Sequence, residues 1–285
     1  MNIQLLALDL DGTVLTVTKD LSARNIEAIR RAAFLGIRII PTSGRTFGNM
    51  PDEILSLPGV THAITSNGAA IVDMKSGKSV YRHCISADTA AAILELLKRF
   101  PVQPSAYIDG QMYDYEQIDL ESLKAVHGIG SLARRIRVPD LGAYIREKGA
   151  GVEKLFVLYL DRSCAGSVRE ALADIPGILF TSSGVNNMEI NAMGATKGNA
   201  LSWLCSRLGI PKEAVMAIGD GHNDLSMLRF AGYPIAMGNA VEELKAQAAD
   251  VTLSCEESGV AHAIERYLDS IGCSSDVKID IKTGL

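Results

Sequence analysis

The stretch that determines the fold is LLALDLDGTVL, at residues 5–15. Residues 3–8 form a near-continuous apolar run, which is typical of a central parallel strand that is covered on both faces. Asp9 and Asp11 follow this run, and Gly12 lets the backbone turn away sharply. Two carboxylates this close repel one another unless a cation or a shared proton lies between them. The stretch therefore predicts a cation site after a buried strand, although a plain Asx-type turn can have the same residues.

The segments that follow alternate between helix and strand. Ser22 can cap a helix that Gly36 ends in the left-handed conformation, and a second buried strand is expected at residues 37–40. A short helix near residues 51–57 and a third strand around residues 63–65 continue the alternation. This order of elements predicts an α/β fold that is built on a doubly wound parallel sheet.

The alternation breaks in the middle of the chain. Residues 83–189 mix helices, strands and Gly-rich loops, and we expect them to form an inserted α+β cap domain. From Lys197 the helix and strand alternation returns and completes the sheet, so the core domain is expected to comprise residues 1–82 and 190–285. The final residues, 274–285, are polar and are interpreted as an extension of unknown order.

Composition and charge exclude several classes of function. The formal net charge is −5 and no basic stripe is present, which argues against nucleic acid as a partner. No apolar run approaches the roughly 20 residues that cross a bilayer, so we expect a soluble protein without a membrane partner, either a monomer or a small homo-oligomer. Five scattered cysteines form no zinc motif and indicate reduced thiols in a cytoplasmic protein: Cys84, Cys164, Cys205, Cys255 and Cys273.

Polar motifs are expected where the parallel strands end, because the carboxyl ends of such strands converge on one edge of the sheet. Four motifs fit this position: LDLDGT (8–13), PTSGR (41–45), ATKGNAL (195–201) and GDGHND (219–224). Mg²⁺ prefers oxygen ligands and usually accepts only one or two carboxylates, so the carboxylates of Asp9 and Asp220 are suitable ligands. The sequence therefore predicts Mg²⁺ as the cofactor.

The two weaker motifs allow a second interpretation. Ser43 and the neighbouring amides can form an anion-binding nest for phosphate, but the same residues can be a helix cap followed by an exposed Arg45. Lys197 opens a helix, where the helix dipole disfavours a cation unless an anion lies nearby, yet a solvated surface lysine is an equal alternative. In GDGHND an N-capping role holds for one residue but does not explain all of Asp220, Asn223 and Asp224.

LLALDLDGTVL, PTSGR, the lysine in TKGNAL, and GDGHNDLSML, in this order and spacing, resemble the four motifs of the haloacid dehalogenase superfamily. More narrowly, the chain resembles its Cof-type phosphatases, which carry a large α/β cap after the third strand. The resemblance covers nearly the whole chain. It implies a Rossmann-like core of this superfamily together with the inserted cap.

The resemblance also implies a role for each matching residue. Asp9 matches the nucleophile, Asp11 the general acid/base and Lys197 the charge-neutralising lysine. Ser43 matches the phosphate-binding hydroxyl, a position where this branch often carries Thr, and Asn67 matches a loop residue that faces the substrate. The full expected site has substrate-binding residues Ser43, Gly44, Arg45, Asn67 and Asn223 and metal-binding residues Asp9, Asp11, Asp220 and Asp224.

The expected function is that of a Mg²⁺-dependent phosphatase acting on a small phosphorylated metabolite through an aspartyl-phosphate. Sugar phosphates, pyridoxal phosphate and nucleotides are all open as substrates. A phosphomutase of the same superfamily would keep all four motifs, although the large cap argues against it. From another class, the chain could be a non-catalytic phosphate-binding or regulatory protein, or a receiver domain phosphorylated on Asp9.

Overall fold

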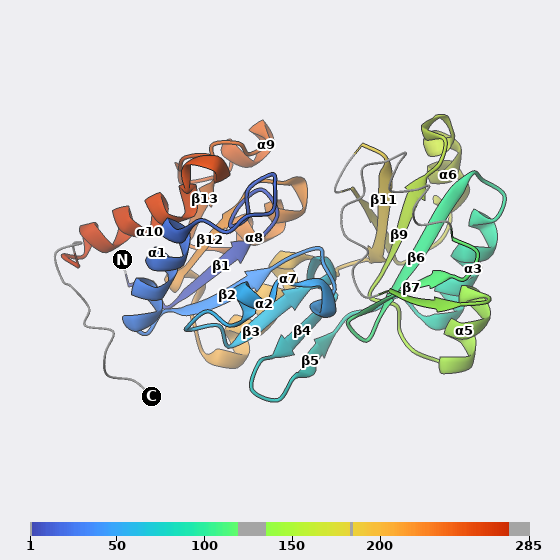
Figure 1. Ribbon diagram of the computed structural model, residues 1–285, viewed down its shortest axis with the longest axis horizontal. Helices are drawn as coiled ribbons and strands as arrows, with labels where there is room; N and C mark the ends of the chain where they lie inside the picture. Colours follow the sequence, from blue (N-terminus) through green and yellow to red (C-terminus); the bar gives the residue numbers. More distant parts are fainter. Residues whose placement is uncertain (1, 119–134, 183–184, 274–285) are drawn as a thin grey trace. The chain divides into compact units, whose positions relative to one another are not determined.

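The computed structural model describes residues 2–118, 135–182 and 185–273, in which the strands form two sheets (Figure 1). The larger sheet has eight strands, in the spatial order β14 (Asp250–Val251), β13 (Tyr233–Ala236), β12 (Val215–Gly219), β1 (Leu5–Asp9), β2 (Arg38–Thr42), β3 (His62–Thr65), β4 (Ala70–Asp73) and β5 (Lys78–Arg82). The smaller sheet has six, in the order β10 (Ile178–Thr181), β11 (Asn187–Ala192), β9 (Lys154–Tyr159), β6 (Val102–Ile108), β7 (Gln111–Tyr115) and β8 (Arg135–Val138).

The α-helices of these residues are α1 (Ala23–Phe34), α2 (Asp52–Leu55), α3 (Ala87–Leu97), α5 (Leu141–Lys148), α6 (Ala165–Leu172), α7 (Lys197–Leu208), α8 (Leu225–Phe230), α9 (Glu242–Lys245) and α10 (Gly259–Ser270). Contacts divide the chain into two compact units. The first unit comprises Met1–Pro41, Ser56–Thr61 and Leu204–Leu285, and the second comprises Thr42–Leu55 and His62–Trp203. The domain boundaries predicted after residues 82 and 189 stay predictions.

Strand order in the larger sheet reverses next to β1. β1 pairs in parallel with β12, with Leu5 opposite Val215, and β12 and β13 continue the parallel pairing on that side. On the other side β2 pairs in parallel with β3, and β4 and β5 add an antiparallel hairpin. The predicted doubly wound parallel sheet is therefore confirmed, with its topological switch point between β1 and β12, where such folds bind their ligands.

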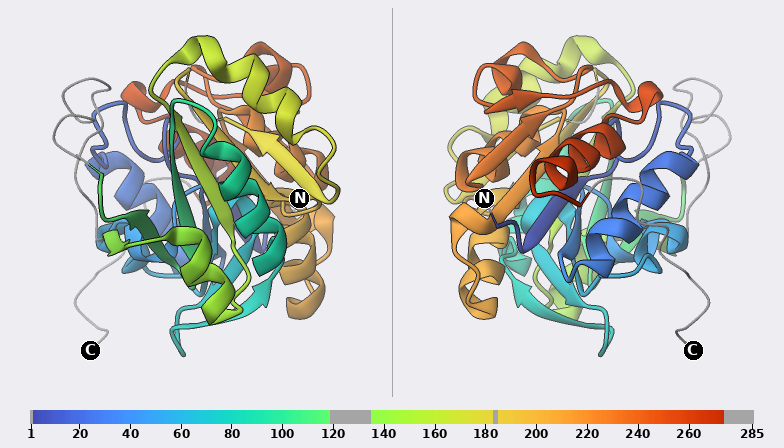
Figure 2. Two further views of the ribbon diagram at one scale, coloured as in Figure 1. Left: turned by 90° about the vertical axis from the view of Figure 1, so that its right-hand side faces the viewer. Right: turned by 90° about the vertical axis from the view of Figure 1, so that its left-hand side faces the viewer.

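The apolar pattern of β1 explains its central place in the first unit. All five residues of the strand are buried, and each fully buried leucine side chain contributes about 1.5–3 kcal/mol relative to an exposed one. Helix α1 begins as predicted, because the Ser22 side chain accepts a hydrogen bond from the Asn25 amide at 3.1 Å. Helices α1 and α10 pack side by side (Figure 2), and the buried Asn25 side chain accepts a hydrogen bond from the Ala261 amide at 2.9 Å.

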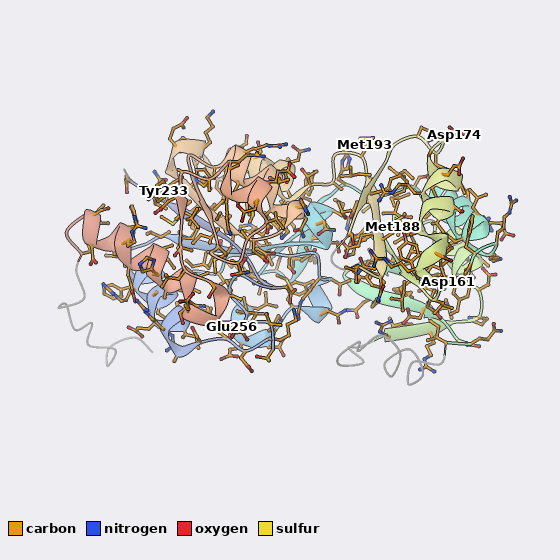
Figure 3. All side chains as sticks on the ribbon, turned by 90° about the horizontal axis from the view of Figure 1, so that it is seen from above. Asp161, Asp174, Met188, Met193, Tyr233 and Glu256 are labelled. Atoms are coloured by element: carbon orange, nitrogen blue, oxygen red, sulfur yellow. The ribbon has the colours of Figure 1, made fainter. Side chains whose placement is uncertain are left out.

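In the second unit, helices α3, α5 and α6 lie against one face of the six-stranded sheet (Figure 2). Leu94, Ile145, Val157 and other apolar side chains fill the space between helices and sheet. Met188 on β11, which is labelled in Figure 3, belongs to this core. The opposite face of the same strands carries polar and charged residues, because side chains alternate along a strand.

Among the strands and α-helices of the residues that the structure describes, β7, β8, α5 and α10 were not predicted from the sequence. The predicted extension at residues 274–285 lies outside the described residues. Across the described ranges, every helix is too short or too polar to span a bilayer.

Candidate functional site

A cluster of three carboxylates lies at the topological switch point of the first unit. Asp9 ends β1, Asp220 directly follows β12, and Asp224 closes the 3-10 helix that comes next. One oxygen of each side chain lies within 4.8 Å of the others. Asp9 and Asp224 are buried, and negative charges at this distance repel one another unless a cation or a shared proton lies between them. The donors are carboxylate oxygens, which fit a hard divalent ion such as Mg²⁺.

Neighbouring residues fix the carboxylate of Asp220. The hydroxyl of Thr13 donates to Asp220 Oδ1 at 3.0 Å, and the side-chain amide of Asn239 lies 3.5 Å from Oδ2. Gly12 has a φ of +88°, and a Cβ at this position would lie only 2.5 Å from Asp220 Oδ2. The turn after β1 therefore needs glycine both for its conformation and for its close approach to Asp220.

Asn239 was not predicted as part of the site. Its side-chain amide also donates to the carbonyl of Gly12 at 2.9 Å, so it links two loops of the cluster. The signal in the sequence is its position just after β13, the next parallel strand beyond β12, where polar side chains converge on the same edge.

Asp224 has a structural role as well as its place in the cluster. Its Oδ2 accepts hydrogen bonds from the amides of Asp220 at 3.0 Å and Gly221 at 2.9 Å, so Asp224 is the N3 carboxylate of a capping box whose N-cap residue is Gly221. Asn223 lies beside it and is half-buried. His222, which was given no role, is exposed and lies 3.4 Å from Glu243.

Asp11 lies outside this carboxylate cluster. Its side chain is partly exposed and forms an ion pair of 2.9 Å with Lys19. The cluster therefore contains three of the four residues predicted to bind metal. The general acid/base role of Asp11 stays a prediction.

In the second unit, Ser43 follows β2 and is buried, and its hydroxyl accepts a hydrogen bond from the Arg45 amide at 3.1 Å. The alternative of a helix cap at Ser43 is wrong, because the next 3-10 helix begins at Phe47 and Thr46 is its N-cap residue. Arg45 is half-buried and donates to the carbonyl of Asn49 at 3.2 Å.

The loop after β3 lies against the start of α7 in the same unit. Ser66, Asn67 and Gly68 all have positive φ, at 51°, 60° and 97°. A Cβ on Gly68 would lie 2.2 Å from the carbonyl oxygen of Thr196, so this loop directly contacts the backbone that precedes Lys197. Lys197 is fully buried, and the alternative of a solvated surface lysine is therefore wrong.

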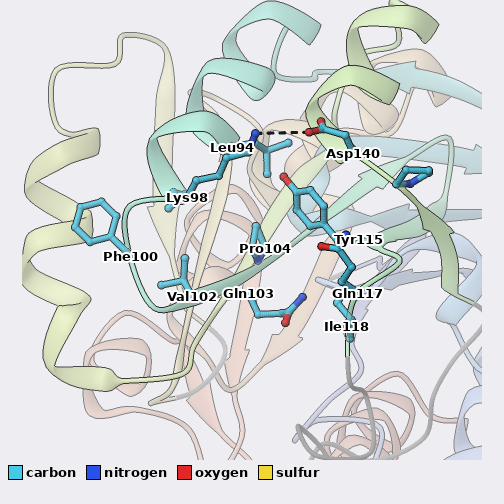
Figure 4. A pocket seen from close by; sticks show the side chains of 12 residues that line it. Leu94, Lys98, Phe100, Val102, Gln103, Pro104, Tyr115, Gln117, Ile118 and Asp140 are labelled. Carbon is cyan, nitrogen blue, oxygen red and sulfur yellow. Dashed lines mark ion pairs between the residues drawn. The ribbon is translucent and has the colours of Figure 1, made fainter.

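A separate cavity of about 490 Å³ lies in the second unit between the end of α3 and the start of α5 (Figure 4). Its wall includes Phe100, Tyr115 and the ion pair between Lys98 and Asp140, whose charged atoms are 3.5 Å apart. In the described part of the chain, the side chains that line this cavity include none of the predicted site residues.

Comparisons with known proteins agree with the fold. The family model described as haloacid dehalogenase-like hydrolase matches residues 6–264. The chain is 30% identical over 287 residues to the phosphatase YwpJ of Bacillus subtilis, covering 93% of this chain and 100% of that protein. It is 30% identical over 283 residues to the 5-amino-6-(5-phospho-D-ribitylamino)uracil phosphatase YwtE of the same organism, covering 92% of this chain and 97% of that one.

A solved structure of a haloacid dehalogenase-like hydrolase from Bacteroides thetaiotaomicron matches with a TM-score of 0.81 at 29% identity, covering 93% of this chain and 100% of that chain. The predicted fold class and the predicted class of enzyme, a phosphatase, are confirmed at this level. The match of the family model over most of the chain identifies this protein as a member of the haloacid dehalogenase-like hydrolase family.

Proposed function

We propose that this chain is a Mg²⁺-dependent phosphatase that hydrolyses a small phosphomonoester with Asp9 as the nucleophile. The observation that carries the proposal is the cluster of Asp9, Asp220 and Asp224 at the switch point of the sheet, in a chain of this hydrolase family. A bound cation favours the charged form of a buried carboxylate that lies close to two others, and a charged carboxylate is what nucleophilic attack requires.

The reaction has two balanced steps. In the first, an oxygen of Asp9 forms a bond to phosphorus while the bond to the ester oxygen breaks, and protonated Asp11 gives its proton to the departing alcohol. In the second, Asp11 removes a proton from water, whose oxygen bonds to phosphorus as the bond to Asp9 breaks. Mg²⁺, when bound, neutralises negative charge on the transferring group. Ser43 is proposed to donate to a phosphate oxygen, and Lys197 to offset its charge.

For the substrate, we propose a phosphorylated metabolite of low molecular weight. The similarity to a relative named for a phosphorylated ribitylamino uracil supports a substrate with a polar, hydroxyl-rich leaving group. Compounds of this class join sugar phosphates, pyridoxal phosphate and nucleotides as candidate substrates. A cytoplasmic location is proposed from the scattered cysteines alone, each of which is a free thiol in the structure.

The test is hydrolysis of p-nitrophenyl phosphate by the purified chain. EDTA should abolish turnover, Mg²⁺ should restore it, and Ca²⁺ should restore it poorly, because the larger coordination shell of Ca²⁺ misaligns nucleophile and phosphorus. His222→Ala is the matched control, since this exposed residue lies in the same loop as Asp220 and should leave turnover unchanged.

Each alternative predicts a different outcome. Full activity in EDTA would contradict the metal assignment. A stable phosphoprotein without turnover would indicate a receiver domain, and transfer of the phosphoryl group to a second hydroxyl without release of phosphate would indicate a phosphomutase. If p-nitrophenyl phosphate is turned over, a panel of phosphorylated metabolites then ranks the substrate classes by kcat/KM.

A further inference from the structure

A buried polar network lies within the second unit, outside the residues predicted to act in catalysis. Its members are Glu153 and Lys154, where β9 begins, and Glu189 and Asn191 on β11. Each of these side chains is at least 95% buried. Charged side chains are almost never buried this deeply unless they are paired, so their contacts should explain why they are present.

Lys154 connects strand β9 to the loop that contains Ser43. Its ammonium group donates to the carbonyl oxygen of Gly44 at 2.5 Å and forms an ion pair of 3.2 Å with Glu189. It also lies 4.5 Å from the centre of the Tyr107 ring. Gly44 itself has no room for a side chain, because a Cβ there would lie 2.8 Å from Asn67 Oδ1.

The other three members hold the loop that contains Asn67. Glu189 accepts a hydrogen bond from the Asn67 side-chain amide at 2.6 Å, and Glu153 accepts one from the Ser66 hydroxyl at 2.7 Å. The side-chain amide of Asn191 donates to the carbonyl of Ser66 at 3.0 Å. Successive positive φ angles in this loop are unfavourable, so they persist only where the surroundings fix them.

Stability alone does not account for this arrangement. Burying the Lys154–Glu189 pair costs desolvation energy that the attraction between the charges repays only partly, and apolar residues of the same size often stabilise a protein as well or better. Both members of the pair, however, contact a loop that was predicted to bind substrate. Their contacts therefore fix the backbone from which Ser43 and the Gly44 amide would reach a phosphate oxygen.

We propose that Lys154 and Glu189 are positioning residues for phosphate binding: they hold the loops at residues 43–45 and 66–68 in the geometry that binds the phosphoryl group. The inference rests on the proposed phosphatase function, because it needs a phosphate at Ser43. The residues act through backbone and side-chain contacts of the two loops, and they do not themselves enter the chemical step.

The test is the double variant Lys154→Met, Glu189→Gln. It removes both charges of the pair and retains an acceptor for Asn67, but it removes the donor to the Gly44 carbonyl. The Kd of inorganic phosphate, measured by calorimetry in excess Mg²⁺, should rise roughly tenfold, the loss expected for a buried hydrogen bond from a charged donor. The matched control is Asp114→Asn, which breaks the buried pair between Asp114 and Arg135 in the same sheet, where the separation is 3.0 Å.

The control should lower the melting temperature yet keep the Kd of phosphate within about twofold of wild type. An unchanged Kd in the folded double variant would overturn the proposal, and so would an equal rise in the control. If the double variant does not fold, amide hydrogen exchange of the wild-type protein, measured with and without phosphate, tests the proposal instead. Phosphate should slow exchange in residues 150–156 as well as in residues 42–46. Unchanged exchange at residues 150–156 would overturn the proposal. A failure of the phosphatase proposal would give a different result: the wild-type protein would bind phosphate but would not hydrolyse a phosphate ester.

Discussion

Gly12→Ala is the most informative single change in the acidic cluster. At a φ of +88° any residue with a Cβ costs about 1–2 kcal/mol. The new Cβ would in addition lie 2.5 Å from Asp220 Oδ2, and ordinary contact begins at 3.4 Å. The carboxylate of Asp220 must therefore retreat by about 1 Å, a displacement that can cost about 100-fold in rate when it misplaces a catalytic group.

Gly36→Ala is the control, because Gly36 has a similar φ of +82° and a Cβ added there would meet no atom within 4 Å. Both variants should lose about 2–4 °C of melting temperature for each kcal/mol of lost stability. Only Gly12→Ala should lower kcat/KM for p-nitrophenyl phosphate by about 100-fold and raise the Mg²⁺ concentration for half-activation. If the two variants agree within about twofold in both quantities, Asp220 does not hold the metal.

Three further changes test the remaining assignments. Asp9→Asn should abolish turnover while circular dichroism stays that of the wild type, because an amide cannot attack phosphorus; residual activity above about a hundredth of wild type would refute the role. Asp11→Asn should accumulate phosphoenzyme with p-nitrophenyl phosphate, since this leaving group needs little protonation but hydrolysis still needs a base; acid-quenched mass spectrometry should find the phosphoryl group on the peptide with Asp9, and normal turnover would contradict the mechanism. Burial raises the pKa of Cys84 and of Cys205 to about 11, so at pH 8 each carries about a hundredth of the thiolate of a thiol with a pKa of 9. Iodoacetamide should therefore leave both cysteines of the native protein unmodified at pH 8, and their alkylation should accelerate as the pH approaches 11. In the urea-unfolded protein, both cysteines should react quickly.

The sequence predicted those parts of the fold whose signals are local. The apolar run before Asp9 predicts a buried strand because a strand covered on both faces needs apolar residues at every position. Ser22 and Gly36 mark the ends of α1 through their own capping chemistry. The acidic cluster could be predicted because each carboxylate follows a parallel strand, and such strands place their carboxyl ends together.

The parts that could not be predicted depend on tertiary contacts. Lys154 is the first residue of β9, and a lysine at the end of an apolar strand is expected to be exposed. It is buried because it contacts Glu189 and the Gly44 carbonyl, which are distant in sequence. Asn239 belongs to the site through contacts with Gly12 and Asp220, and its position after β13 indicates the edge of the sheet but not these two partners. Pairing partners of this kind have no periodic pattern in the sequence.

The pairing of β1 with β12 has a consequence for folding during synthesis of the chain. Asp9 belongs to β1, and the carboxylates of Asp220 and Asp224 come from segments that are much later in the sequence. Strand β2 is available to pair with β1 early, but the pairing of β1 with β12 must wait until β12 has been synthesised, and contacts between such distant segments form slowly. A nascent chain that ends before residue 215 contains one of the three clustered carboxylates, so the cluster assembles only after the segment that carries β12 and the loop after it has been synthesised.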